Sequence, residues 1–104
     1  MRLYHATDDG PAILREGFTR CHIPDGAKVA WLSAQRDRVG AGRGRNHLVV
    51  VVDLPDELVR PYVYRVNGAA IDPNLFCLPH DVINAYRLTF TLEPGPEAQP
   101  PPDP

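Results

Sequence analysis

Two short apolar runs of the chain each carry one side chain suited to chemistry. The first run, Leu3–Thr7, contains His5, and the second, Val29–Ser33, contains Trp31. An imidazole exchanges protons near neutral pH, and an indole offers a wide flat face for stacking. Runs of this kind are typical of buried strands. Two such strands side by side would aim the imidazole and the indole at one cleft, which suits a flat ligand with polar edges.

A second group suited to binding is a pair of arginines, Arg43 and Arg45, in a segment that also holds Gly40, Gly42 and Gly44. Glycine frees the backbone there, and arginine makes forked contacts with phosphate. The pair suits the pyrophosphate of a dinucleotide or the phosphates of an RNA end, and a solvated loop is the plain alternative. Neither a Walker motif nor a dinucleotide fingerprint follows a predicted strand, which excludes P-loop and Rossmann sites.

Cysteine and histidine are poorly spaced for a metal centre. Cys21 and His22 are neighbours, so their side chains point apart in an extended segment. Cys77 and His80 would have to meet them to complete a zinc site, and Cys77 is better explained as a small buried residue. We therefore predict no structural metal. Two cysteines are also too few for a disulfide framework, which favours reduced thiols in a cytoplasmic protein.

The bulk composition indicates one small globular domain. The chain has 104 residues, 43% of them hydrophobic and 23% charged, with a formal net charge of -2. That charge gives no general attraction to nucleic acid or to an anionic membrane. The longest apolar run, Leu48–Val52, is far shorter than the roughly twenty residues of a membrane helix. Met1–His5 does not resemble a secretory signal, so we expect a cytoplasmic protein with no membrane partner.

The elements that must position these groups are mostly short strands. One helix is predicted from Asp8 to Gly17, with a carboxylate cap, an early proline and a glycine stop. A valine-rich strand over 47–54 is apolar on both faces and belongs in the middle of a sheet. Shorter strands are predicted at 2–6, 28–32, 61–66, 75–78 and 86–92. The pattern predicts an α+β fold over residues 1–92, with two small, mostly antiparallel sheets packed face to face around a cleft. Residues 93–104 are rich in proline and are predicted to be a disordered tail.

In their order and spacing, these segments resemble the ADP-ribosyltransferase superfold. This superfold is the split β-sandwich of poly(ADP-ribose) polymerases, bacterial ADP-ribosylating toxins and tRNA 2′-phosphotransferases. The matching segments are Tyr4-His5-Ala6-Thr7, Glu16-Gly17-Phe18, Trp31-Leu32-Ser33, the strand Leu48–Asp53, and Leu78-Pro79 ahead of Val82-Ile83. The resemblance covers nearly the whole chain before the tail and implies that NAD binds between two sheets, with no metal.

The resemblance also implies roles for single residues. His5 takes the position of the histidine that hydrogen-bonds the ribose of NAD. Trp31 takes that of the aromatic residue that stacks on nicotinamide, and Ser33 that of a serine near the nicotinamide amide. The implied NAD-binding residues are Tyr4, His5, Thr7, Trp31, Ser33, Arg43 and Arg45.

The third motif departs from the family pattern. The reaction breaks an N-glycosidic bond through an oxocarbenium-like state, which a nearby carboxylate stabilises. The position of the family's glutamate falls on Asn74 or Leu75, and the nearest carboxylate is that of Asp72. We therefore take His5, Asn74 and Asp72 as the candidate catalytic residues.

This departure leaves three functions open. The chain transfers ADP-ribose from NAD to a protein, nucleic acid or small molecule, or to water. Alternatively it is a catalytically degenerate member that binds a nucleotide or a protein, or an RNA 2′-phosphotransferase-like enzyme. Tyr4 and Trp31 stand where the phosphotransferases have arginine and histidine. This difference argues against the RNA 2′-phosphotransferase-like function. Compact members of the superfamily are often toxins or phage effectors, so a cognate inhibitor or a target protein is a further partner class.

Overall fold

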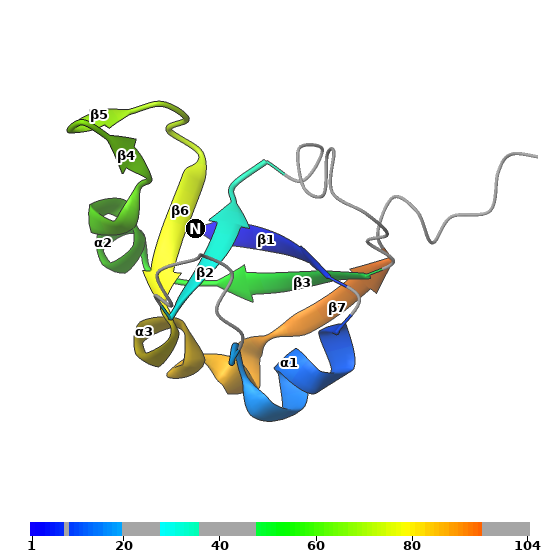
Figure 1. Ribbon diagram of the computed structural model, residues 1–104. Coiled ribbons are helices and arrows are strands. Elements are labelled where there is room, and N and C mark those ends of the chain that lie inside the picture. The colour runs from blue at the N-terminus through cyan, green and yellow to red at the C-terminus, as the bar shows by residue number, and fades with distance from the viewer. Residues whose placement is uncertain (8, 20–27, 36–47, 95–104) are drawn as a thin grey trace, which may run out of the picture.

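The chain folds around one five-stranded antiparallel sheet with the strand order β6-β2-β1-β3-β7 (Figure 1). This computed structural model describes residues 1–7, 9–19, 28–35 and 48–94. The sheet contains β1 (Arg2–Thr7), β2 (Val29–Ser33), β3 (Leu48–Asp53), β6 (Leu75–Pro79) and β7 (Thr91–Pro94), and a separate hairpin contains β4 (Arg65–Val66) and β5 (Ala69–Ala70). The helices are α1 (Gly10–Glu16), α2 (Asp56–Val59) and α3 (His80–Asn84), and the 3₁₀ turns are η2 (Arg60–Tyr62) and η3 (Arg87–Thr89). The predicted α+β class and antiparallel pairing are confirmed.

The central strand β3 is apolar on both faces, as its valine run predicts. Val50 and Val52 belong to the main core, whereas Val49 and Val51 form a second cluster with Tyr4 on the other face. These valines are 0 to 3% exposed. Because alternate residues of a strand point to opposite faces, a strand covered on both faces needs an apolar side chain at every position.

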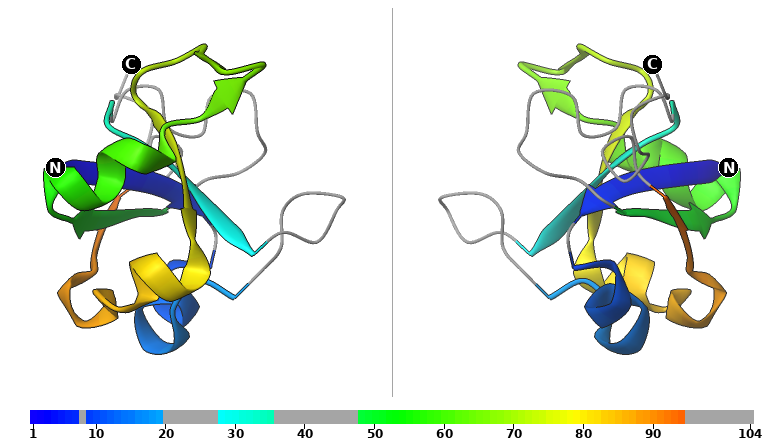
Figure 2. Two further views of the ribbon diagram at one scale, coloured as in Figure 1. Left: turned by 90° about the vertical axis from the view of Figure 1, so that its left-hand side faces the viewer. Right: turned by 90° about the vertical axis from the view of Figure 1, so that its right-hand side faces the viewer.

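The main core lies between the sheet and the helices α1 and α3, which cover the same side of it (Figure 1, Figure 2). Its most buried side chains come from distant parts of the chain. Leu3 of β1, Leu32 of β2, Leu78 of β6 and Ile83 of α3 are each 0 or 1% exposed. The core therefore ties β1, β2 and β6 to α3.

The sheet is narrowest where β1 meets β2. Their register pairs Tyr4 with Ser33 and no other residues, whereas β1 pairs with β3 from Arg2 to Thr7. The strands thus form two well-paired groups, β6-β2 and β1-β3-β7, joined at one point. The prediction of two sheets packed face to face is wrong for the described strands. Main-chain pairing at Tyr4 and Ser33 joins the two groups edge to edge in one sheet.

The end of α1 is fixed by a glycine and by a distant side chain. Gly17 has φ 85 and ψ -174, a conformation that is essentially restricted to glycine. The next residue, Phe18, is held by the side-chain amide of Asn84. Asn84 Oδ1 accepts the Phe18 N–H at 2.7 Å, and Asn84 Nδ2 donates to the Phe18 carbonyl at 3.0 Å. The predicted helix stop at Gly17 is confirmed.

Two predicted strands differ in the structure. The segment 61–66 begins as the 3₁₀ turn η2, followed by one bridge from Val63 to Phe76 and then by β4. Pro61 explains the first change, because proline has no N–H for a strand ladder and fits the first turn of a helix. The segment 86–92 contains η3, and its strand β7 starts at Thr91. There Arg87 turns back to donate to the Leu14 and Arg15 carbonyls.

β7 also continues beyond the predicted end of the domain. Glu93 pairs with Val49, and Pro94 pairs with Leu48, so these two residues belong to the sheet and not to a tail. Residues 95–104 of the predicted tail lie outside the described residues. Across the ranges that the structure describes, none of the helices has the length and apolar character to cross a membrane.

Candidate functional site

His5 is held at the junction between β1 and β2. It lies on the core face of β1 with Leu3, and its ring meets the ring of Phe18 edge-on, with centroids 5.0 Å apart and an interplanar angle of 85°. His5 Nδ1 lies 2.7 Å from the main-chain carbonyl oxygen of Trp31. Because a carbonyl only accepts, Nδ1 carries the proton and donates it. In the neutral imidazole, Nε2 is then the basic nitrogen.

The indole of Trp31 lies on the opposite face of the sheet. Its neighbours in β2, Ala30 and Leu32, are core residues at 1% exposure, so the alternation of the strand directs Trp31 away from the core. The indole packs against Tyr64, with ring centroids 4.9 Å apart. The expectation that the imidazole and the indole face one hollow is therefore wrong. His5 meets the main chain of Trp31, and its ring lies on the other side.

The hydroxyl residues of the first two motifs stabilise turns. Thr7 Oγ1 accepts the Asp9 N–H at 2.9 Å, which fixes the start of α1. Ser33 Oγ accepts the Gln35 N–H at 3.0 Å and donates to the Gln35 carbonyl at 3.2 Å. Tyr4 is half-buried and packs on the second valine cluster. These groups therefore serve the local structure around His5.

The third-motif candidates lie in the turn that leads into β6. Asp72 Oδ1 accepts the Asn74 N–H at 2.9 Å, and the Asp72 carbonyl accepts the Leu75 N–H at 3.2 Å. The Asn74 carbonyl in turn accepts the Ala34 N–H at 2.8 Å. Asp72 therefore uses one carboxylate oxygen to shape the turn. The side-chain amide of Asn74 makes no hydrogen bond to another described residue.

The structure does not bring Asn74 next to His5. Asn74 precedes β6, and β2 lies between β6 and β1 in the sheet. With neighbouring strands about 4.8 Å apart, the two backbones are separated by roughly 10 Å. The arginines Arg43 and Arg45 lie outside the described residues.

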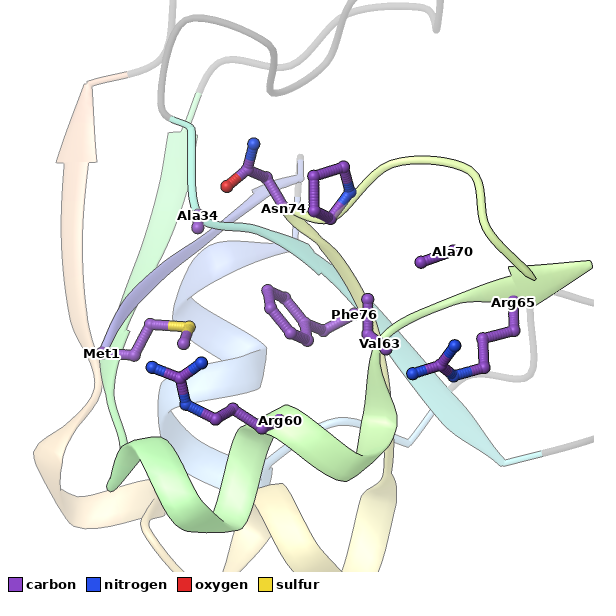
Figure 3. Close-up of a pocket in the computed structure, with 9 residues that line it drawn as sticks. Met1, Ala34, Arg60, Val63, Arg65, Ala70, Asn74 and Phe76 are labelled. Atoms are coloured by element: carbon purple, nitrogen blue, oxygen red, sulfur yellow. The ribbon is translucent and has the colours of Figure 1, made fainter. Parts of the chain in front are cut away.

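Asn74 instead borders a pocket of about 540 Å³ (Figure 3). The pocket collects residues from four parts of the chain: the residue before β1, the residue after β2, the η2–β5 region, and the turn before β6 with β6 itself. Its lining residues are Met1, Ala34, Arg60, Val63, Arg65, Ala70, Pro73, Asn74 and Phe76. Sequence reasoning missed this pocket, since Arg60 and Arg65 belong to no motif and only the folded chain brings them near Asn74.

The thiol of Cys77 is unsuited to nucleophilic or metal chemistry. Cys77 pairs with Trp31 across β2 and β6, and burial raises its pKa from 9.0 to about 11. Since the thiolate is the reactive form, this thiol is inert near neutral pH. In the part of the chain that the structure describes, no cluster of three or more histidine, cysteine, aspartate or glutamate side chains is arranged to hold a metal ion.

Comparison with protein-family models, with curated proteins and with solved structures found no match to this chain. The site is therefore interpreted from its own geometry. Of the groups assigned to NAD from the sequence, the His5 imidazole is oriented for hydrogen bonding, whereas the Trp31 indole does not share its face of the sheet.

Proposed function

We propose that this chain is an NAD-binding protein of the ADP-ribosyltransferase type, acting in the cytoplasm. The single observation that carries the proposal is the hydrogen bond from His5 Nδ1 to the Trp31 carbonyl. It holds a half-buried imidazole at the narrow junction of β1 and β2. The resemblance implies a ribose-binding histidine in the first strand, and His5 belongs to β1. The single pairing of Tyr4 with Ser33 at that junction also supports a sheet that is split into two groups of strands.

The proposed role of His5 is to accept a hydrogen bond from a ribose hydroxyl of NAD. The Trp31 carbonyl keeps the proton on Nδ1, so that Nε2 is the accepting nitrogen. Positioning the ribose in this way favours cleavage of the bond to nicotinamide, because the departing group and the acceptor are then aligned. In this proposal the main chain of Trp31 orients His5, and the indole has no stacking role.

Transfer is expected to be slow, because the stabilising carboxylate is missing. Cleavage places positive charge on the ribose, and a carboxylate beside it lowers the barrier. Asn74 is neutral, and Asp72 uses a carboxylate oxygen in its own turn. This observation favours a second candidate function, in which the chain binds NAD or an ADP-ribosylated partner without turnover.

The test is to measure NAD binding and nicotinamide release with the same set of variants. We expect wild type to bind NAD and His5→Ala to lose binding. The control is Asn74→Gln, which should leave NAD binding and nicotinamide release unchanged, because β2 lies between the Asn74 turn and the strand of His5.

The outcomes separate the two candidates. NAD binding without nicotinamide release in wild type supports the degenerate binding module. Release in wild type that is lost in His5→Ala supports the transferase. Failure of wild type to bind NAD, or unchanged binding in a folded His5→Ala variant, contradicts both.

A further inference from the structure

We propose that the pocket beside Asn74 is a binding site for a phosphorylated ligand with a flat ring, of the nucleoside monophosphate class. The site is separate from the His5 junction. The proposal for it therefore does not depend on the proposed function. Its volume of about 540 Å³ is larger than a phosphate ion needs and lies within the range of small-molecule pockets.

Two arginines supply the positive charge of the pocket. Arg60 and Arg65 belong to its lining, and among the described residues no acidic side chain does. Arg60 is 72% exposed and lies 3.6 Å from Asp56, which also pairs with the amino group of Met1 at 2.8 Å. The Asp56 carboxylate is thus shared between Arg60 and the amino group of Met1. The Arg60 guanidinium therefore keeps N–H groups that can donate hydrogen bonds to a ligand. Arginine suits phosphate because its planar group forms two parallel hydrogen bonds.

The remaining lining suits the body of a nucleotide. Phe76, Val63 and Met1 present apolar surface to the pocket, and Figure 3 shows Met1 and Arg60 on one side of the Phe76 ring with Asn74 at the rim. The thioether of Met1 and a guanidinium plane both favour contact with a flat ring. The Asn74 amide has a donor and an acceptor, and it makes no hydrogen bond to another described residue. That pair matches the polar edge of a base.

Two buried leucines separate this pocket from His5. Met1 lines the pocket, and Leu3 lies between Met1 and His5 on the same face of the extended chain. Leu3 is 0% exposed, and Leu32 beside it in the core is 1% exposed. With a rise of about 3.3 Å per residue, Met1 and His5 are roughly 13 Å apart along the backbone. A ligand in the pocket therefore does not reach the imidazole.

The experiment is a titration of the full chain with AMP and with UMP, followed by amide NMR and calorimetry. We expect both nucleotides to bind and to shift the amide signals of Ala34 and Phe76, which line the pocket. We expect Arg60→Gln and Arg65→Gln each to weaken binding roughly tenfold, the usual cost of one charged hydrogen bond. Adenosine and inorganic phosphate should each bind more weakly than AMP.

The matched control is Arg2→Gln, which removes an arginine that pairs with Asp53 outside the pocket. AMP affinity should be unchanged in Arg2→Gln and in His5→Ala. No binding of either nucleotide, equal affinity in a folded Arg60→Gln/Arg65→Gln double variant, or signal shifts at Val50 in place of Phe76 would overturn the proposal. His5→Ala separates the two hypotheses, because it removes NAD binding at the junction and leaves AMP binding intact.

Discussion

At the scale of single residues, a main-chain carbonyl determines the chemistry open to His5. The Trp31 carbonyl accepts the proton of Nδ1, so the neutral ring has Nε2 as its acceptor. A substitution of the Trp31 side chain leaves this carbonyl in place. The identity of the aromatic residue therefore matters for packing against Tyr64, and the backbone of β2 matters for orienting the imidazole.

Cys77 gives a prediction of pH-dependent reactivity. Its pKa is raised from 9.0 to about 11 by burial, so the folded chain holds roughly a hundredfold less thiolate than an exposed cysteine does at pH 8. We expect alkylation of Cys77 by iodoacetamide to be slow at pH 8. The rate should rise about tenfold per pH unit up to about pH 11, because only the thiolate reacts. The measurement is made in a Cys21→Ser variant, by mass spectrometry.

The control for Cys77 is the same variant unfolded in urea, where the thiol should react at the rate of an exposed cysteine. Fast alkylation of the folded chain at pH 8, equal to that of the unfolded chain, would show that Cys77 is accessible and ionised. Its packing opposite Trp31 would then be wrong.

At the scale of elements, the end of α1 depends on Gly17. Its φ of 85 is strained for other residues, and an added Cβ would lie 2.6 Å from Asn84 Oδ1. That contact would displace the amide that holds Phe18. We expect Gly17→Ala to lower the free energy of unfolding by about 3 kcal/mol, the sum of backbone strain and a lost, partly buried hydrogen bond. Urea denaturation measures this change.

Gly68 provides the matched control for that prediction. It lies in the turn between β4 and β5 with φ 82, but an added Cβ there meets nothing within 4 Å. Gly68→Ala should therefore cost only the backbone strain, about 1 kcal/mol. Equal costs at the two glycines would mean that the contact with Asn84 contributes nothing.

The elements predictable from sequence were those with local causes. Gly17 needs its backbone conformation whatever surrounds it, and Asn67-Gly68 forms its turn with positive φ at both residues. The valine run of β3 directly predicts a strand that is buried on both faces. The strand predicted from alternation at 61–66 was wrong, because the 3₁₀ turn over Arg60–Tyr62 has the same apolar spacing as a strand.

The candidate site was predictable only in part, because its geometry depends on pairings between distant segments. The sequence identified His5 and its strand, but the face on which Trp31 lies follows from the register of β2 with β1 and β6. The pocket was even harder to predict from local sequence. Met1, Arg60 and Asn74 meet only after three separate segments have packed together.

At the scale of the whole molecule, the narrow β1–β2 junction and the continuous core have opposite effects on cooperativity. A single pairing at Tyr4 and Ser33 would let the two groups of strands open separately. The core opposes this, since Leu32 and Leu78 of one group pack in the same cluster as Leu3 and Val50 of the other. Fully burying one such side chain contributes about 1.5–3 kcal/mol, more than a typical main-chain hydrogen bond. The contribution of the shared core is the larger one, so we expect the described sheet to unfold as one unit.

Leu32→Ala tests this cooperativity. Leu32 is 1% exposed in β2, so its truncation leaves a cavity and should cost about 3 kcal/mol. Because the core is shared, amide hydrogen exchange should accelerate by the same factor, roughly a hundredfold, at Leu78 in β6 and at Val50 in β3. The amides of the separate β4–β5 hairpin should exchange by local opening and change little. Acceleration confined to Leu78, with Val50 unchanged, would instead mean that the two groups of strands open independently at the Tyr4–Ser33 junction.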